Sequence, residues 1–349
     1  MNQLTEQTPG VGSRRGAAAS ALFAALGTAL ALALALAHLL AYAPAGSGVR
    51  RASVRIPAGS DLRQIARALA DAGVIASPQA FVLAARFAGF DRRLRPGDYQ
   101  LDPRLSLPAL LRALQEGRGR VATITIPEGW RLEQIAERLA AAGVCGRDEF
   151  LAAARDRALL AELAIPGPSA EGFLFPETYA LPLPTSPAEV VRALHRQFDK
   201  VWAELAAGAA PQQLAPLAVV TLASIVERET AAPAERPLVA AVFLNRLRLG
   251  MPLQADPTVI YGIEGFDGNI RRRDLTAANP YNTYVIRGLP PGPIANPGRD
   301  SLAAVLAPAP VDYLYFVARN DGTHQFSRSL TEHNRAVQRH QLAGGRRRG

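Results

Sequence analysis

The sequence is poor in the residues that make covalent cross-links and metal centres. Its 349 residues include a single cysteine, Cys145, which excludes an intrachain disulfide and a zinc site built from several thiolates. The five histidines are scattered without the spacing of metal ligands, so we expect neither a metal nor a cofactor. Lys200 is the only lysine, and nearly all of the 39 basic residues are therefore arginine.

The composition is that of a folded, basic protein. Hydrophobic residues make up 49% of the chain and the mean hydropathy is +0.05, which excludes a disordered chain. The length predicts about two domains of ~150 residues each, with extensions. The net charge of +9 suits anionic lipid surfaces or acidic polymers, but no basic stripe rich in aromatic residues is present, so we expect no nucleic-acid partner.

Residues 17–43 lack Asp, Glu, Lys and Arg and consist mainly of Ala and Leu. As a helix this stretch would be about 40 Å long, more than the ~30 Å hydrocarbon core of a bilayer. The small-x-small sequence at 41–43 leaves a cleaved signal peptide as the alternative. The apolar core of such a peptide has only about 7–15 residues, however, and Pro44 would follow the cut. We therefore predict a retained transmembrane helix over 17–43, preceded by a tail of residues 1–16, with an orientation that the flanking arginines leave open.

Two stretches downstream match each other at an offset of 70 residues. Residues 53–75 and 123–145 each have the pattern of a short alternating strand, a Pro/Gly turn and an amphipathic helix with apolar residues at i, i+3, i+4 and i+7. The similarity continues less regularly beyond these stretches, where Tyr99 corresponds to Tyr179. The pattern indicates two copies of one unit in tandem.

The fold class that these patterns predict is α+β. Two small strand–helix modules, at 44–120 and 121–205, lead into a mixed domain at 206–341, and we expect a disordered basic tail at 342–349. The second module resembles LysM, a strand–helix–helix–strand fold that binds glycans containing N-acetylglucosamine. A scaffold without glycan contact is the alternative.

A helix predicted over 214–230 ends its apolar run at Glu227. A carboxylate in that position would be partly desolvated, which raises its pKa and suits it to act as a general acid. Glu229 lies about 200° further around the helix, so the two acids cannot share a face. The alternative for Glu227 is an ion pair with an arginine such as Arg246.

Three segments further on carry the remaining motifs. The first, 237–262, reads as a helix ending near Gly250, followed by a short polar strand-like stretch. The second, 279–298, is dense in Asn, Thr, Tyr, Pro and Gly, which suits hydrogen bonding to sugar hydroxyls and stacking on sugar rings, although a rigid loop is the alternative. The third, 312–334, contains His324, for which substrate contact and a loop role both stay open.

A resemblance to a known family is carried by ASIVERET, FLNRLRLGMPLQADPTVIYG, YNTY, GLPPGPIANPG and YLYFVARNDGTHQFS. Together these segments look like the YceG/MltG family, the endolytic murein transglycosylases, over almost the whole chain. The resemblance implies a single-pass enzyme of the cell inner membrane, with a cytoplasmic N-terminus and most of the chain in the periplasm. It also implies a LysM-like module and a catalytic domain that cuts nascent peptidoglycan glycan strands, with peptidoglycan synthases as candidate partners.

By motif, the catalytic glutamate of the family maps onto Glu227. The implied reaction cleaves the β-1,4 bond between N-acetylmuramic acid and N-acetylglucosamine without water and leaves a 1,6-anhydro end, with one carboxyl acting first as acid and then as base. Asp256 is the best candidate for a second acid or for electrostatic support. We predict that the glycan is bound by Gln254, Asp256, Tyr261, Tyr281, Asn282 and Asn296, with a structural role as the alternative for each.

Three rival functions remain open on the sequence alone. A hydrolase of the same polymer would use Glu227 and Asp256 as its two carboxylates. A non-catalytic anchor would bind glycan through the tandem modules and recruit synthases. A pyridoxal-phosphate lyase, an older label of this family, needs a lysine for its Schiff base, and Lys200 lies outside every motif-dense region.

Overall fold

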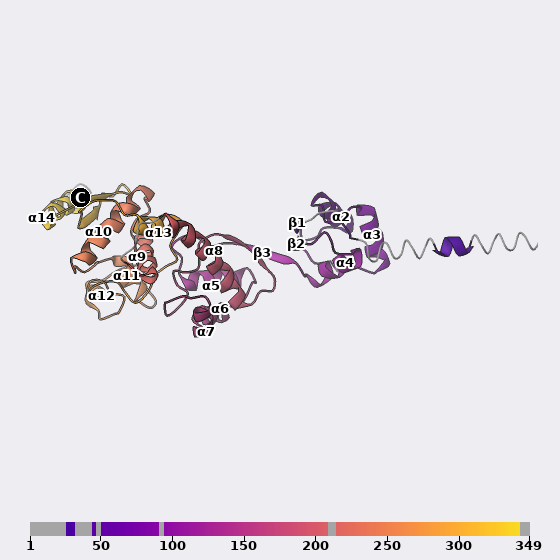
Figure 1. The fold of residues 1–349 in the computed structure, drawn as a ribbon, viewed down its shortest axis with the longest axis horizontal. Helices are drawn as coiled ribbons and strands as arrows, with labels where there is room; N and C mark the ends of the chain where they lie inside the picture. Colours follow the sequence, from indigo (N-terminus) through magenta and orange to yellow (C-terminus); the bar gives the residue numbers. More distant parts are fainter. Residues whose placement is uncertain (1–25, 32–43, 47–49, 91–93, 209–213, 343–349) are drawn as a thin grey trace, which may run out of the picture. The chain divides into compact units, whose positions relative to one another are not determined.

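The computed structural model describes residues 26–31, 44–46, 50–90, 94–208 and 214–342, and it has the α+β character that the sequence predicts (Figure 1). The chain divides into two compact units, Met1–Val121 and Ala122–Gly349, and each has its own hydrophobic core.

The predicted membrane helix at 17–43 lies outside the described residues except for a short helical piece at 26–31. The predicted tail at 1–16 lies outside them entirely, as does all but Leu342 of the tail at 342–349. Within the described ranges, no helix is both long enough and apolar enough to cross a membrane.

The first unit packs three helices against a small antiparallel sheet. Side chains on β1 and β2 point alternately to the two faces of the sheet. Four large ones face the helices and are almost completely buried, namely Val54, Ile56, Tyr99 and Leu101. Strand β1 pairs with β2, and β2 pairs with the first residues of β3. The elements in chain order are β1 (Ala52–Ile56), α2 (Leu62–Asp71), α3 (Pro78–Phe87), β2 (Gly97–Leu101), α4 (Leu107–Glu116) and β3 (Arg120–Thr125).

The second unit begins with the remainder of β3 and a group of helices. Strand β4 (Thr178–Pro182) lies next to β3 in the strand order β1-β2-β3-β4. The helices of this part are α5 (Leu132–Ala141), α6 (Arg147–Ala153), α7 (Arg157–Glu162) and the long α8 (Pro187–Ala207).

The strand–turn–helix repeat predicted from the sequence is confirmed. Helices α2 and α5 have the same length and begin 70 residues apart, each after a strand and a turn. Both end before a glycine in the left-handed conformation, Gly73 with a φ of 71° and Gly143 with a φ of 68°. The corresponding tyrosines also make the same bond, since Tyr99 donates to the Arg95 carbonyl at 2.6 Å and Tyr179 to the Phe175 carbonyl at 2.5 Å. The likeness of the second copy to LysM remains a prediction.

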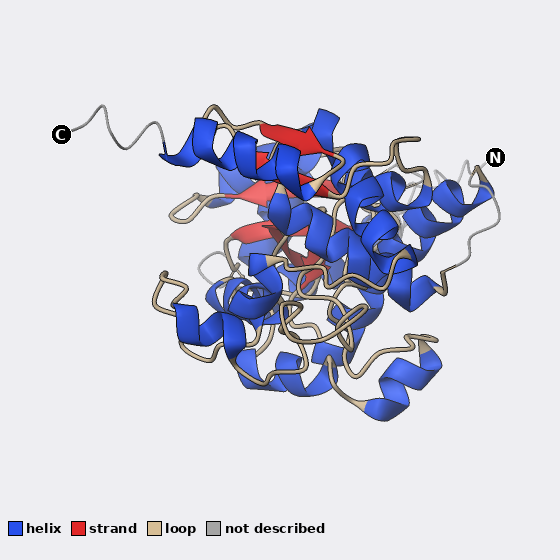
Figure 2. Cartoon of the chain, turned by 90° about the vertical axis from the view of Figure 1, so that its left-hand side faces the viewer, coloured by secondary structure: helices blue, strands red, loops and turns tan. Residues whose placement is uncertain are grey.

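The rest of the second unit is mainly helical, with one two-stranded ribbon (Figure 2). Helix α9 packs against α10, α11 and α13. The elements of this part of the second unit are α9 (Pro216–Glu229), the 3₁₀ turn η1 (Pro233–Glu235), α10 (Arg236–Arg248), α11 (Asp256–Tyr261), α12 (Arg272–Thr276), α13 (Arg299–Leu306), β5 (Tyr315–Ala318), β6 (His324–Ser327), α14 (Leu330–Val337) and the π-turn η2 (Gln338–Leu342).

Three sequence expectations for this part of the chain have different outcomes. The helices predicted over 214–230 and up to about Gly250 are confirmed as α9 and α10. The strand-like interpretation of the polar stretch after α10 is wrong, because Asp256–Tyr261 forms the short helix α11 with Pro257 in its first turn. The proposed boundary between 121–205 and 206–341 stays a prediction, since one core runs from Ile124 to Leu306 across it.

Candidate active site

Helix α9 carries two glutamates into different surroundings. Its residues 219–226 are all buried, so the helix crosses the core, and its last turn brings Glu227 and Glu229 out of it. Pro216 begins the helix in its first turn, and Thr230 ends it by adopting an extended backbone. Because residues two apart on a helix differ by about 200° in direction, the two carboxyls leave α9 on opposite sides.

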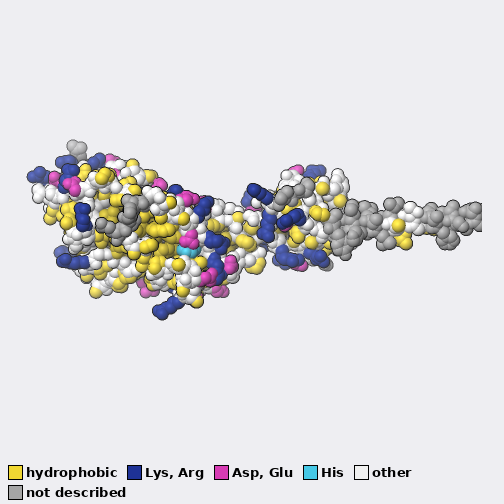
Figure 3. All heavy atoms as spheres, in the orientation of Figure 1, with side chains coloured by type: hydrophobic (Ala, Val, Ile, Leu, Met, Phe, Trp, Pro, Cys, Tyr) yellow, Lys and Arg dark blue, Asp and Glu magenta, His cyan; other side chains and the backbone are white. Residues whose placement is uncertain are grey.

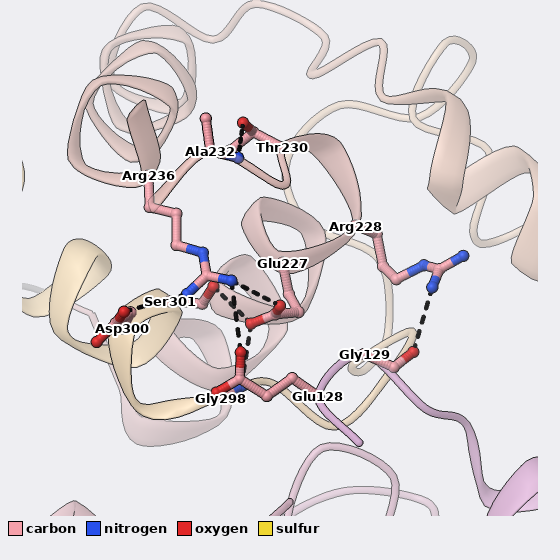
Figure 4. Close-up of polar contacts among 10 residues, drawn as sticks. All are labelled: Glu128, Gly129, Glu227, Arg228, Thr230, Ala232, Arg236, Gly298, Asp300 and Ser301. Atoms are coloured by element: carbon pink, nitrogen blue, oxygen red, sulfur yellow. Dashed lines mark hydrogen bonds and ion pairs between the residues drawn. The ribbon is translucent and has the colours of Figure 1, made fainter. Parts of the chain in front are cut away.

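Glu227 is fully engaged by neighbouring protein groups (Figure 4). Its Oε1 accepts a hydrogen bond from the Arg236 guanidinium at 3.1 Å, in an ion pair. Its Oε2 accepts two more, from the Ser301 hydroxyl at 2.7 Å and the Gly298 backbone N–H at 3.0 Å. Only 7% of the Glu227 side chain is exposed. The alternative foreseen for this residue, an ion pair with an arginine, is therefore found, with Arg236 in place of Arg246.

Arg236 lies at the start of α10 and collects three acids around one guanidinium (Figure 4). Besides Glu227, its nitrogens lie 3.4 Å from a carboxylate oxygen of Glu128 and 3.4 Å from one of Asp300. Burial and the nearby charge of Glu227 raise the pKa of Glu128. This Arg236 cluster fastens the end of α9 to α10, to the turn before α5 and to the first turn of α13.

Glu229 faces a separate hollow of about 370 Å³ in the same unit, hereafter the Glu229 hollow. Burial and, less strongly, the negative charge of Asp256 raise the pKa of Glu229 to about 8, against the opposing charge of Arg246. Across the described part of the chain, no group donates a hydrogen bond to the Glu229 carboxyl. The polar side chains around it are those of Arg246, Gln254, Asp256, Tyr284, Gln341, His324 and His333.

The Glu229 hollow has a rigid floor. Arg246 is almost fully buried, and its guanidinium donates to the backbone carbonyls of Leu314 at 2.7 Å and Leu253 at 2.6 Å while lying over the ring of Tyr315. Burial lowers the pKa of Arg246. These fixed bonds leave Arg246 as a positive charge beneath Glu229 rather than a mobile partner for it.

The rim of the hollow places two predicted residues beside Glu229. Asp256 is exposed at the start of α11, and its Oδ1 accepts a hydrogen bond from the Tyr284 hydroxyl at 2.7 Å. Burial and this bond raise the pKa of Tyr284. Gln254 is exposed with a φ of +53°, a left-handed backbone that is strained for a residue with a Cβ.

Thr283 holds that rim in place. Its carbonyl accepts from the Gln254 N–H at 3.0 Å, and its hydroxyl accepts from the Ala255 N–H at 2.9 Å and lies 2.8 Å from the Thr258 hydroxyl. The four-residue segment 281–284 thus clamps the residues before α11, and the strained conformation of Gln254 persists because these bonds define it.

Two of the predicted glycan-binding residues are committed to the protein itself. The Asn282 amide is buried and donates to the carbonyls of Asp274, Leu275 and Ala277 at 3.1, 3.3 and 2.9 Å, at the end of α12. Asn296 is fully buried, and its bonds go to the backbone around Trp130 and Gly172 and to Glu171. Their amides are therefore turned to structural use, which was the alternative for each.

Tyr261 and Tyr281 lie together beside a second buried acid. Their ring centroids are 4.7 Å apart, and the Tyr261 hydroxyl lies 3.5 Å from the Glu171 carboxylate. Burial raises the pKa of Glu171 to about 8 even though Leu132 N–H and the Asn296 amide donate to it. Neither tyrosine lines the Glu229 hollow, so the structure separates these two predictions from those for Gln254 and Asp256.

Sequence reasoning missed several residues of the hollow. Glu229 was set aside because it lies on the other side of α9 from the apolar run that ends at Glu227. Tyr284 and His333 are not among the predicted residues, although both lie in segments that carry the family resemblance or directly follow its last motif. The usable signal was the second acid of the IVERET segment, two residues from the first.

His324 lies at the edge of the hollow as part of a pair. Its Nδ1 lies 2.6 Å from Oε2 of the buried Glu235, and its backbone N–H donates to Oε1 of the same carboxylate at 2.8 Å. The pair links β6 to η1, the turn between α9 and α10. Within the ranges that the structure describes, no group of three or more His, Cys, Asp or Glu is arranged to hold a metal ion.

A carboxyl of raised pKa in an open polar hollow, over a fixed positive charge, is the arrangement of an acid–base enzyme. The comparisons with known proteins agree with that class. The chain belongs to the YceG-like family, whose model matches residues 54–339.

Named relatives share most of this chain. The endolytic murein transglycosylase of Bacillus subtilis strain 168 is 33% identical over 304 residues, which cover 82% of this chain and 84% of that protein. The endolytic murein transglycosylase of Streptococcus pneumoniae D39 is 29% identical over 320 residues, and the match spans 58% of its length. The crystal structure of a YceG-like protein from Listeria monocytogenes superposes with a TM-score of 0.57 at 33% identity, covering 81% of this chain and 98% of that one.

The family resemblance drawn from the five segments is thereby confirmed. The prediction of an enzyme is also confirmed, because the homologues are endolytic murein transglycosylases, which belong to the lyase class. The comparisons assign no role to an individual residue of this chain.

Proposed function

We propose that this protein is an endolytic lytic transglycosylase of peptidoglycan whose general acid is Glu229. The observation that carries the proposal is the setting of Glu229: a carboxyl with no hydrogen-bond donor among the described residues, in an open hollow, with a pKa raised to about 8. Such a carboxyl is protonated near neutral pH and can give its proton to a substrate oxygen.

In the proposed reaction Glu229 donates its proton to the glycosidic oxygen as the bond to C1 of N-acetylmuramic acid breaks. The cation-like centre at C1 develops beside the exposed carboxylate of Asp256, which is of the right charge to stabilise it. The Glu229 carboxylate then takes the proton of the C6 hydroxyl, whose oxygen closes on C1. The products are a 1,6-anhydro end and a free N-acetylglucosamine hydroxyl, and no water is consumed.

This assignment places the acid two residues after Glu227, the position that the family motif predicts. Glu227 accepts hydrogen bonds from Arg236, Ser301 and Gly298, so both of its oxygens are already engaged by protein donors and are not free to reach a sugar. We assign Glu227 to holding the end of α9 through the Arg236 cluster, which sets the position from which Glu229 projects.

The cellular setting belongs to the same proposal. Residues 17–43 would form a single inner-membrane anchor with residues 1–16 in the cytoplasm, and the two described units would lie in the periplasm, where nascent glycan strands and their synthases are found. The length and apolar character of the 17–43 stretch support the anchor.

Analysis of products by mass spectrometry tests the chemistry. Wild-type protein, Glu229→Gln and Glu227→Gln are incubated with uncrosslinked glycan strands. We expect anhydro ends from wild-type protein, none from Glu229→Gln, and a reduced but measurable amount from Glu227→Gln.

The rival functions predict other outcomes. A hydrolase, with Glu229 in place of the Glu227 expected from the sequence and with Asp256 as its second carboxylate, would release reducing ends in place of anhydro ends. A non-catalytic anchor would leave the glycan intact and would make Glu229→Gln neutral in cells. A pyridoxal-phosphate lyase would need Lys200, which is exposed on α8 and does not line the Glu229 hollow.

A further inference from the structure

The first unit has a groove along the seam between α2 and α3, hereafter the α2–α3 groove, with a volume of about 410 Å³. Arg63 and Arg67 line it from α2, one helical turn apart, and Arg86 lines it from the last turn of α3. All three arginines are exposed, and among the described residues none of them makes an ion pair or a hydrogen bond. The groove lining contains no acidic side chain.

Exposed apolar side chains accompany these arginines. Leu83 lines the groove and is 56% exposed, and Phe87, on the same side of α3 one turn later, is 86% exposed. Phe87 is the most exposed of the large hydrophobic residues in the described part of the chain. A phenylalanine in that position gains nothing from the fold of the unit, which suggests that its apolar surface is used outside it.

The positive charge of the protein is concentrated in this unit. Residues 44–121 contain 13 arginines and 6 acidic residues, a net charge of +7, whereas the 228 residues that follow carry 24 basic and 23 acidic residues, a net charge of +1. Dark-blue arginine side chains beside yellow apolar ones are visible on the first unit in Figure 3. An anionic partner is therefore attracted to the first unit and not to the protein as a whole.

The predicted anchor would place a membrane surface close to the α2–α3 groove. Residues 44–46 follow the 17–43 stretch directly and are hydrogen-bonded to the first unit, with Ala45 N–H donating to the Leu105 carbonyl at 2.8 Å and Ala76 N–H donating to the Ala45 carbonyl at 2.6 Å. Ala76 belongs to the connection between α2 and α3, so residues 44–46, which follow the predicted anchor, lie at one end of the α2–α3 groove. Helix α3 has 10 residues and is about 15 Å long, which is the distance along the groove from this end to Phe87.

We propose that the α2–α3 groove is a membrane-docking surface that binds anionic phospholipid, with Arg63, Arg67 and Arg86 on the headgroups and Leu83 and Phe87 inserted between them. Exposed apolar side chains flanked by arginines are the features of surfaces that lie in the membrane interface. Docking would hold the first unit flat on the bilayer beside its anchor. The proposal rests on the membrane anchor proposed above and is independent of the chemistry at Glu229.

The test uses the full chain reconstituted in vesicles of phosphatidylcholine with or without phosphatidylglycerol. Cys145→Ser removes the native thiol, and an environment-sensitive fluorophore is attached at Gln79→Cys in the groove or at Ser53→Cys, which faces away from the helices on β1. We expect spin-labelled lipid to quench the probe at position 79, but not at position 53, and only in the vesicles with phosphatidylglycerol. Co-flotation of the protein with vesicles reports separately on the anchor.

Two variants complete the test. Combined Arg63→Glu, Arg67→Glu and Arg86→Glu should reduce quenching at position 79 to that at position 53. Arg104→Glu, Arg112→Glu and Arg118→Glu change the net charge of the unit by the same amount outside the groove and should retain the quenching. Equal quenching at positions 79 and 53, or equal loss in the two variants, overturns the proposal. The proposal is also overturned if a soluble acidic polymer shields the probe at position 79 from solvent while the lipid vesicles do not quench it.

Discussion

The Arg236 guanidinium donates a hydrogen bond to the Glu227 carboxylate at 3.1 Å. Glu229, two residues further along α9, lines the hollow on the other side of the helix. The first acid of this helix end is thus held by three protein donors, while the second has no donor among the described residues and a raised pKa. The two acids are two residues apart, just over half a turn of helix, and the ~200° between their directions places them in different surroundings.

The Arg236 cluster should matter more for stability than for chemistry. Arg236→Met leaves the carboxylates of Glu227 and Glu128 without their cation, and loss of one member of a buried ion pair costs about 3–5 kcal/mol. Chemical denaturation measures this free energy of unfolding. Arg299→Met is the matched control, since its pair with Glu204 is exposed and contributes little to the free energy of unfolding. Equal losses in the two variants would contradict the structural role.

Activity should fall as the pH rises through about 8. The reaction needs Glu229 protonated, and burial raises its pKa to about 8, so the active fraction is lost above that value. Asp256→Asn removes a negative charge that contributes to the raised pKa of Glu229. We therefore expect the alkaline limb of initial rate against pH to move to lower pH in Asp256→Asn. A limb that stays in place would show that another group controls the pH dependence.

The pH dependence of stability should carry the same signature. The folded-state pKa of Glu229 lies above its usual value of 4.5, so the stability it supports is complete below pH 4.5 and is lost as the pH rises through about 8. Glu229→Gln should flatten the fall in unfolding free energy between these values. Glu171→Gln should do likewise, because the pKa of Glu171 is also raised to about 8, while leaving catalysis less affected than Glu229→Gln. A pH profile unchanged in both variants would exclude buried neutral carboxyls at these positions.

Tyr284→Phe should reduce activity without unfolding the protein. The hydroxyl donates to Asp256 at 2.7 Å, and a hydrogen bond to a charged group contributes about 1.5–3 kcal/mol, which corresponds to a loss of roughly 10- to 100-fold in kcat/KM if the bond orients Asp256 for the transition state. Tyr281→Phe is the control within the same segment, because Tyr281 does not line the hollow. A similar loss in both variants would indicate a general effect on the segment.

Gln254→Gly should stabilise the protein and weaken the enzyme. The backbone of Gln254 has a φ of +53°, and relief of that strain is worth about 1 kcal/mol, measured as a rise in unfolding free energy. The lost amide at the rim should raise KM for glycan. Gln254→Ala separates the two effects, since it also removes the amide but keeps the strain. An unchanged KM in both variants would exclude glycan contact by this side chain.

Local patterns in the sequence predicted much of the fold. The 70-residue offset and the periodicity of 53–75 and 123–145 predicted matching strand–turn–helix elements, because such patterns are set by neighbours along the chain. The same reasoning failed for 256–261, where a polar stretch reads as strand-like and the clamp by Thr283 instead supports a helix. That clamp joins residues more than twenty positions apart, which a local pattern does not report.

For the candidate active site, too, some features follow from the sequence and others only from the tertiary structure. The sequence by itself determined the family and the acid-bearing helix end, and it singled out Gln254 and Asp256, which line the same hollow as Glu229, since these depend on contiguous motifs. Only the tertiary structure decided which acid faces the hollow and that Asn282 and Asn296 are turned inward. The surroundings of Glu227 are set by Arg236, Ser301 and Gly298, and those of Glu229 by Arg246 and Asp256. A sequence pattern does not report these groups, because desolvation and charge act through space and not along the chain.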